Sequence, residues 1–137
     1  MTSLYMLDAN MVRHTIKRQP QAIARLLEVP MHSVCISAVT AGELAFGLAK
    51  RPQALALREA VNEFLRRVEV MPWDAAVAQT YGTLRAALYT KGNPLAALDL
   101  QIAAHALHVK ATLVSNDKAF AQVSLLVVED WVKVRES

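Results

Sequence analysis

Short apolar runs alternate with longer amphipathic segments along the whole chain. The runs have the length of buried strands and lie at residues 4–7, 34–36, 68–71, 112–114 and 125–128. Helical segments separate successive runs, and strands joined in this way pair in parallel through right-handed crossovers. We therefore expect an α/β fold, a three-layer α/β/α sandwich around a mostly parallel sheet.

The segments between the runs carry helix signals at their ends. Pro20 and Pro52 are expected to begin helices, and Ser37 and Asp74 have the residue type and position of N-caps. Gly92 stands where a left-handed cap is needed, in the closing sequence KGNP at 91–94. The expected helices cover residues 11–18, 20–29, 38–50, 52–67, 75–89 and 98–108.

Composition favours a single folded domain over residues 1–137. Apolar residues make up 54% of the chain and charged residues 20%, which excludes a disordered or fibrous protein. The apolar stretches are shorter than the roughly 20 residues of a membrane span, and no signal-peptide pattern opens the chain, so a cytoplasmic protein is expected. Fifteen basic against twelve acidic side chains permit a nucleic-acid partner without requiring one.

Four of the twelve acids fall where a parallel sheet gathers its ligands. Asp8 ends the first run and Asp117 follows the fourth, while Glu43 and Asp99 lie early in helices with small, apolar neighbours. Strand ends and the first turns of following helices meet at one sheet edge. Each acid also has a local explanation: a helix cap for Asp8, a capping box with Thr40 for Glu43, a helix-dipole charge for Asp99 and a turn for Asp117.

Convergence of these carboxylates predicts a cation. Carboxylates held a few ångströms apart repel one another, and some take up protons unless a positive charge offsets the repulsion. Oxygen ligands without His or Cys indicate Mg²⁺ or Mn²⁺ rather than zinc. The chemistry that such a site supports best is phosphodiester hydrolysis, in which the metal activates water and neutralises charge on the phosphorane oxygens.

Several motifs occur in a characteristic order. They are LDAN at 7–10, ISAVTAGEL at 36–44 with Gly47, PLAALD at 94–99, IAAHA at 102–106, SNDKAF at 115–120 and EDW at 129–131. Together they span nearly the whole chain and resemble those of the PIN-domain ribonucleases, in particular the VapC toxins of bacterial VapBC toxin–antitoxin pairs.

The resemblance implies an enzyme and a set of partners. The enzyme would be a Mg²⁺-dependent endoribonuclease, with Mn²⁺ as a substitute, that cuts single-stranded or loop RNA. The implied substrate is tRNA, with the anticodon loop of initiator tRNA as one candidate. The protein would form a homodimer, and a VapB-type antitoxin would lie across the active-site groove in a larger hetero-oligomer.

The resemblance also assigns roles to residues. Those implied as acidic metal ligands are Asp8, Glu43, Asp99 and Asp117. Asn10 and Ser115 match polar positions that support the ligands by hydrogen bonds. The chain departs from the usual family pattern in having alanine at positions 9, 96 and 119, where Thr, Gly and a second acid are common. The missing hydroxyl at Ala9 supports an alternative, a catalytically silent PIN fold that binds RNA or a protein.

Basic and aromatic residues near these motifs allow two interpretations each. Arg13, Lys17, Arg18 and Lys118 lie close in sequence to the proposed site, where they can hold phosphates or form a solvated helix face. For Trp73 and Trp131, the alternatives are base stacking and core packing, of which packing is favoured. The apolar stripe of residues 53–67 packs inside the monomer or forms a groove for the antitoxin or second subunit.

The remaining reactive side chains are expected to be structural. Cys35 lies within an apolar run without a basic neighbour, which indicates a buried thiol. His105 and His108 lie three residues apart on a predicted helix and show no metal-ligand spacing with the acids, so packing or surface positions are expected.

Overall fold

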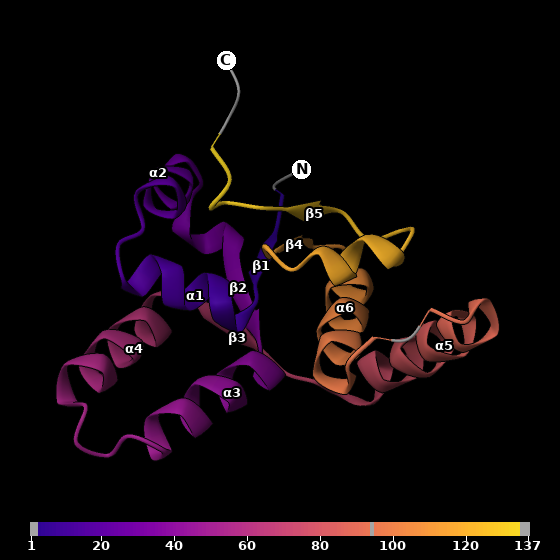
Figure 1. Cartoon of the computed structure of the whole chain (residues 1–137), viewed down its shortest axis with the longest axis horizontal. Helices are drawn as coiled ribbons and strands as arrows, with labels where there is room; N and C mark the ends of the chain where they lie inside the picture. Colours follow the sequence, from indigo (N-terminus) through magenta and orange to yellow (C-terminus); the bar gives the residue numbers. More distant parts are fainter. Residues whose placement is uncertain (1–2, 94, 135–137) are drawn as a thin grey trace.

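The computed structural model describes residues 3–93 and 95–134, and Figure 1 shows helices on both faces of one sheet. Pro94, part of the expected helix ending, lies outside these residues. The strands pair in parallel in the order β3-β2-β1-β4-β5. Their bounds are β1 Tyr5–Leu7, β2 Val34–Ser37, β3 Glu69–Met71, β4 Thr112–Val114 and β5 Val128–Glu129. The predicted α/β/α sandwich is confirmed.

The helices begin and end close to the predicted signals. Ser37 Oγ accepts a hydrogen bond from Val39 N–H at the start of α3, Asp74 Oδ1 accepts one from Val77 N–H at the start of α5, and Gly92 ends α5 with φ 71°. The bounds are α1 Ala9–Ile16, α2 Pro20–Glu28, α3 Ala38–Ala49, α4 Leu55–Arg67, α5 Ala75–Lys91 and α6 Ala97–Val109, with short 3₁₀ helices η1 Met31–Ser33 and η2 Lys118–Gln122. Within the described ranges, every helix is too short or too polar to span a bilayer.

Two predicted boundaries are wrong, and a turn explains each. Pro52 does not begin α4; the Ala54 N–H donates to the Arg51 carbonyl at 3.0 Å, which makes Pro52 the second residue of a turn that suits its fixed φ. The fifth strand begins at Val128 rather than residue 125, because the chain is still turning where Leu126 N–H donates to the Val123 carbonyl.

Alternate strand residues enter two separate cores, one on each face of the sheet. Leu7, Ile36 and Val114 pack with α1, α2, α3 and α4 on one face. Their neighbours Met6 and Leu113 pack with α5 and α6 on the other. Both faces are therefore apolar, which is why each strand reads as a continuous apolar run.

Cys35 belongs to the second of these cores. Burial raises the pKa of its thiol to about 12, so the thiol stays protonated and unreactive at neutral pH. The prediction of a buried structural cysteine is confirmed.

A polar clamp fastens the C-terminal segment to α2. Glu129 Oε1 accepts hydrogen bonds from Arg25 Nη2 at 2.7 Å and from Trp131 Nε1 at 3.0 Å. The Trp131 ring is fully buried, with its centroid 5.6 Å from that of Tyr5. Core packing of Trp131 is thus confirmed. Trp73 is half-buried in edge contact with Tyr81.

We predict that Glu129→Ala lowers the free energy of unfolding by about 2 kcal/mol, because it leaves the buried indole N–H without its acceptor and limits the Arg25 guanidinium to its 3.5 Å pair with Glu28. Urea unfolding of the purified protein measures this loss. Glu63→Ala is the matched control. Glu63 pairs with Arg66 and Arg67 on the exposed surface of α4, and its loss should cost less than about 0.5 kcal/mol. Equal losses in the two variants would contradict the clamp.

Candidate active site

The strand order places a topological switch point beside the central strand, and we call the sheet edge at this point the switch-point crevice. From β1 the sheet continues to β2 on one side and to β4 on the other, so the connections that leave β1 and β4 diverge. Such a switch point is where open α/β sheets bind ligands, at the carboxyl ends of the strands. Leu7 pairs with Val114, and the Asp8 N–H donates to the Val114 carbonyl at 3.1 Å. Asp8 and Ser115, the next residue of each strand's chain, are therefore neighbours at this edge of the sheet.

Asp8 both caps a helix and faces the crevice. Its Oδ1 accepts a hydrogen bond from Met11 N–H at 2.8 Å, which is the predicted capping role, and the Ser115 side chain also hydrogen-bonds to the carboxylate. Only 7% of Asp8 is exposed, and this burial raises the pKa of its carboxyl group, an effect that nearby Asp117 strengthens. The capping and site interpretations of Asp8 are compatible.

The structure brings the other predicted acids to the same crevice. Burial raises the pKa of Glu43, which the guanidinium of Arg13 partly offsets and the charges of Asp8 and Asp99 reinforce. Burial also raises the pKa of Asp99, with Asp117 and Asp8 as further causes. Each acid thus lies within electrostatic reach of at least two others, although they come from four separate elements.

Polar side chains hold parts of this crevice in place. Ser115 Oγ accepts a hydrogen bond from Asp117 N–H at 3.0 Å in addition to its contact with Asp8, so it links two of the acids. Asn10 Oδ1 accepts one from Arg13 Nη1 at 2.9 Å, and Arg13 in turn acts on Glu43. Ser115 therefore supports two carboxylates directly, whereas Asn10 bonds to the Arg13 side chain, which acts on Glu43.

The donor chemistry of the four carboxylates suits a hard divalent ion. All the potential ligand atoms are oxygens. Burial and neighbouring carboxylates raise the pKa of three of the four side chains, and a bound cation would lower the cost of keeping them ionised. As their side chains are arranged, no three His, Cys, Asp or Glu residues among residues 3–93 and 95–134 form a group that could hold a metal ion. Asp8 and Asp117 instead direct an oxygen to a backbone N–H. The Mg²⁺ site stays a prediction.

Comparison with known proteins agrees with this fold. The PIN domain family matches residues 5–126. The chain belongs to the PIN-domain family. It is 34% identical to the tRNA(fMet)-specific endonuclease VapC of Shigella flexneri over 128 residues, which are 93% of this chain and 97% of that protein.

Solved structures show the same fold. The chain superposes with a TM-score of 0.83 and 30% identity on a chain of the DNA-bound VapBC2 complex of Rickettsia felis, covering 92% of this chain and 97% of that one. A chain of the DNA-bound VapBC complex of Salmonella typhimurium gives a TM-score of 0.82 and 32% identity, with 96% and 99% covered. Within the PIN family, this chain is therefore of the VapC type.

A basic groove adjoins the acidic crevice of this PIN domain. It encloses about 370 Å³ between α1, α3 and α4, and Arg13 lies at its acidic end. The other basic side chains that line it are Lys17, Lys50 and Arg51. Sequence reasoning found Arg13 and Lys17 but missed Lys50 and Arg51. Their position in the sequence could have indicated them, because both directly follow α3, the helix that carries Glu43.

The other basic side chains that were predicted to hold phosphates lie outside this groove. Arg18 lines a neighbouring groove between α1, α2 and α4, and Lys118 is exposed at the start of η2, next to Asp117.

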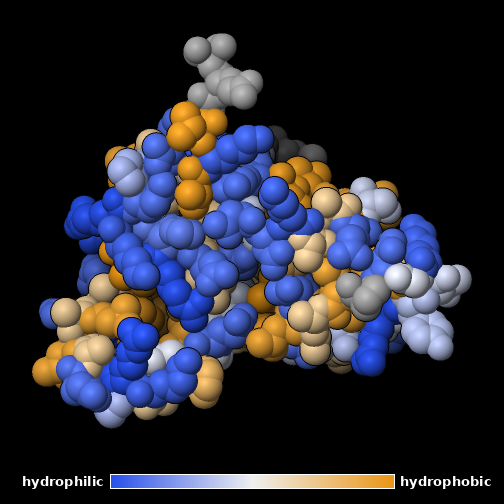
Figure 2. All heavy atoms as spheres, in the orientation of Figure 1, coloured by the Kyte–Doolittle hydropathy of each residue, from blue (hydrophilic) through white to orange (hydrophobic). Residues whose placement is uncertain are grey.

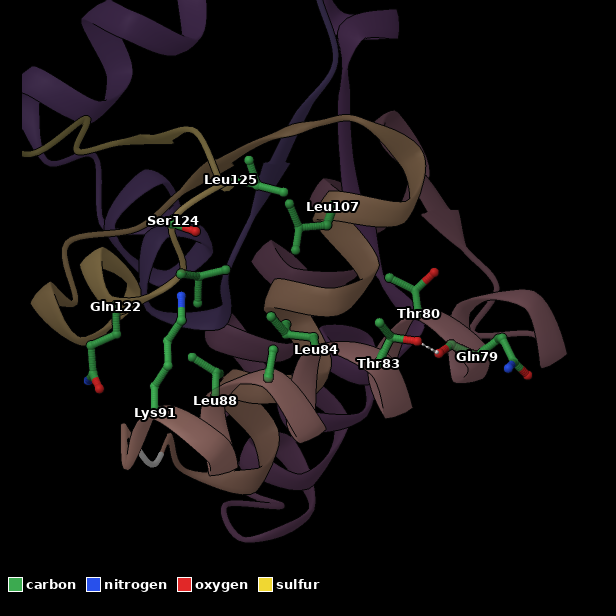
Figure 3. A pocket seen from close by; sticks show the side chains of 12 residues that line it. Gln79, Thr80, Thr83, Leu84, Leu88, Lys91, Leu107, Gln122, Ser124 and Leu125 are labelled. Atoms are coloured by element: carbon green, nitrogen blue, oxygen red, sulfur yellow. Dashed lines mark hydrogen bonds between the residues drawn. The ribbon is translucent and has the colours of Figure 1, made fainter.

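A further hollow of about 350 Å³ lies between α5, α6 and the segment after η2 (Figure 3). Leucines line much of it, including Leu84, Leu107 and Leu125, and no acid does. This hollow therefore lacks the carboxylates found at the switch point.

We predict that Asp8→Asn raises the melting temperature in EDTA by roughly 3 °C at neutral pH. Burial raises the pKa of Asp8, so the folded protein holds this proton more tightly than the unfolded chain does. The ionised carboxylate therefore costs folding more as pH rises through the raised pKa. The gain of the variant over the wild type should grow in thermal melts as pH rises above about 4, the ordinary pKa of an aspartate.

Asp74→Asn is the matched control for this measurement. Asp74 caps α5 through the same kind of bond, with Oδ1 3.0 Å from Val77 N, but it is exposed and outside the crevice. Asn is also a good cap, so neither variant loses its helix start. A gain in both variants, or in neither, would contradict the proposed strain among the crevice carboxylates.

Proposed function

We propose that this PIN-domain protein is the toxin of a VapBC-type toxin–antitoxin pair and acts as a Mg²⁺-dependent endoribonuclease. The observation that carries the proposal is the group of four acids at the β1/β4 switch point, three of them with a pKa raised by burial and by the neighbouring carboxylates. Asp8 is buried and Glu43 and Asp99 are half-buried beside other carboxylates, an arrangement that opposes folding and favours a cation.

Each part of the crevice has a role in this reaction. Asp8, Glu43, Asp99 and Asp117 would hold Mg²⁺, or Mn²⁺ in its place. When bound, the ion supplies an activated water and neutralises charge on the phosphate that is attacked. Ser115 keeps Asp8 oriented, and Asn10 holds the Arg13 guanidinium beside Glu43, where it can bind a phosphate oxygen of the substrate.

The basic groove gives the RNA backbone a path away from the crevice. Its four basic side chains line a hollow about 370 Å³ in volume, and one of them, Arg13, acts electrostatically on Glu43. Lys and Arg side chains that follow a groove bind phosphates without regard to sequence. Exposed Lys118, beside Asp117, offers a further phosphate contact at the crevice.

We propose tRNA as the substrate and the initiator tRNA anticodon loop as the first site to examine. The support is the Shigella flexneri relative, which is named a tRNA(fMet)-specific endonuclease. The Glu129-Asp130-Trp131 motif contributes no base-stacking surface, because Trp131 is buried and Glu129 is bonded to Arg25. Substrate choice must therefore depend on the crevice and the grooves beside it.

A VapB-type antitoxin is the proposed partner, since the structural relatives from Rickettsia felis and Salmonella typhimurium are VapBC complexes. The groove between α1, α2 and α4 contains apolar side chains, among them Leu27, of which 79% is exposed. Figure 2 shows further hydrophobic residues gathered over α3 and α4, where Phe46 and Leu55 are exposed. Exposed apolar surface of this kind suits the antitoxin and a homodimer contact. We place these assemblies in the cytoplasm.

The departures from the family pattern are compatible with activity. Ala96 has φ −58°, so its backbone does not need glycine. Ala9 packs in the apolar core at the start of α1, and none of the four acids is lost. Ala119 donates its N–H to Asp117 Oδ1, a contact that depends on the backbone alone.

We predict that Asp99→Asn lowers the rate of RNA cleavage in Mg²⁺ at least about 100-fold, because a direct ligand matters more than the outer partners whose loss costs about 10- to 100-fold. Cleavage of total RNA and of tRNA by antitoxin-free protein measures the effect. Asp74→Asn, at an exposed helix cap, should cut like the wild type. A wild-type protein that binds RNA but does not cut it in Mg²⁺ or Mn²⁺ would favour the silent PIN fold instead.

We predict that Lys17→Ala weakens RNA binding about equally for all sequences and reduces the slope of log affinity against log salt by about 0.7, the contribution of one phosphate contact to a single strand. Binding of labelled RNA in EDTA at several salt concentrations measures both quantities. Arg85→Ala removes a cation of α5 that lies outside the groove, hydrogen-bonded to Tyr81, and should leave both unchanged. Identical slopes in the two variants would rule out the groove as the RNA path.

A further inference from the structure

A buried hydrogen bond joins α6 to the start of α3. His105 Nδ1 lies 2.8 Å from Ser37 Oγ, and only 1% of His105 is exposed. The two residues are 68 positions apart in sequence. Ser37 Oγ also accepts from Val39 N–H, so this one hydroxyl caps α3 and contacts α6. His108, by contrast, is exposed and bonded to Thr80.

The helices joined by this bond carry two of the crevice acids. Glu43 lies six residues after Ser37 in α3, and Asp99 lies six residues before His105 in α6. The two helices are in contact, and the charge of Asp99 is one of the causes that raise the pKa of Glu43. The helices α3 and α6 therefore interact in two ways, through a hydrogen bond and through the electrostatic repulsion of two carboxylates.

Repulsion between Glu43 and Asp99 pushes α3 and α6 apart, and a fixed hydrogen bond opposes that movement. The polarity of this region also has a cost, because His105 Nε2 and, in the first turn of α3, Thr40 Oγ1 are buried without a hydrogen-bond partner in the described chain. Burial also lowers the pKa of His105, so the ring is neutral and contributes no charge to the crevice. An apolar side chain would fill the same space at a lower desolvation cost.

We propose that His105 is a positioning residue, which through its bond to Ser37 sets the spacing of Glu43 and Asp99 and thereby the affinity of the crevice for Mg²⁺. This inference rests on the proposed metal-dependent function. It makes His105 part of the machinery although it touches neither the ion nor the RNA.

A pair of amide variants separates positioning from packing. Asn at position 105 can place its amide where Nδ1 stands and keep the bond to Ser37, whereas Gln places its amide farther out, near the position of Nε2. We expect His105→Asn to keep the Mg²⁺ dissociation constant within about 3-fold of the wild type and His105→Gln to raise it about 10- to 100-fold, the usual cost of losing a partner that orients a metal ligand. Calorimetric titration with Mg²⁺ alone, without RNA, measures this directly.

Kinetics give a second readout. In His105→Gln, kcat should fall at low Mg²⁺ and recover at high Mg²⁺, while KM for RNA stays unchanged. Ser37→Ala should weaken Mg²⁺ binding in the wild type but add little in the His105→Gln background, since both changes break the same bond. If His105→Gln does not fold, Ser37→Thr, which keeps the hydroxyl, and Ser37→Ala provide the equivalent comparison.

The outcomes distinguish this inference from the proposed function. A wild-type protein that binds no Mg²⁺ and cuts no RNA would overturn the function itself. A wild type that does both, with Asn and Gln variants that differ from it only in unfolding temperature, would leave the function in place and reduce His105 to a packing residue.

Discussion

The burial of carboxylates close to one another at one sheet edge is the constraint on which the candidate site of this protein depends. Asp8 is the most buried of them, and it stays there because the Met11 N–H and the Ser115 side chain bond to its oxygens. Arg13 supplies the nearby positive charge at Glu43. These contacts offset the cost of the site only in part, since the pKa values of Asp8, Glu43 and Asp99 remain raised, first by burial and then by neighbouring carboxylates. When ionised, these carboxylates therefore make the protein less stable than its core alone would allow.

The crevice draws on both layers of the sandwich. Asp8 caps α1 and Glu43 belongs to α3, which both pack on the first face of the sheet. Asp99 belongs to α6 and Asp117 caps η2, beside the second core. The geometry of the site thus depends on how the two layers are held against the sheet. The hydrogen bond from His105 to Ser37 crosses this boundary at the end of β2, which is why a residue outside the crevice can affect it.

Acidic and basic side chains occupy different regions around the candidate site. Acids gather at the switch point, and Arg13 together with basic side chains at the ends of α1 and α3 lines the groove that begins beside them. The net charge of +3 is too small to indicate a nucleic-acid partner by itself. Its distribution is more informative, because an anionic substrate bound along the groove meets the carboxylates only at the groove's end.

Local signals in the sequence determined the elements and most of the site. Strand lengths, the Ser37 and Asp74 caps and the left-handed Gly92 depend on a few neighbouring residues, so they could be predicted, as could acids that directly follow strands, such as Asp8 and Asp117. Tertiary structure alone decided which strands adjoin, the turn at Pro52, the place of Lys50 and Arg51 beside Arg13, and the contact of His105 with Ser37. The physical reason is range. Backbone propensity acts over a few residues, whereas side chains 68 positions apart meet only through strand order and layer packing.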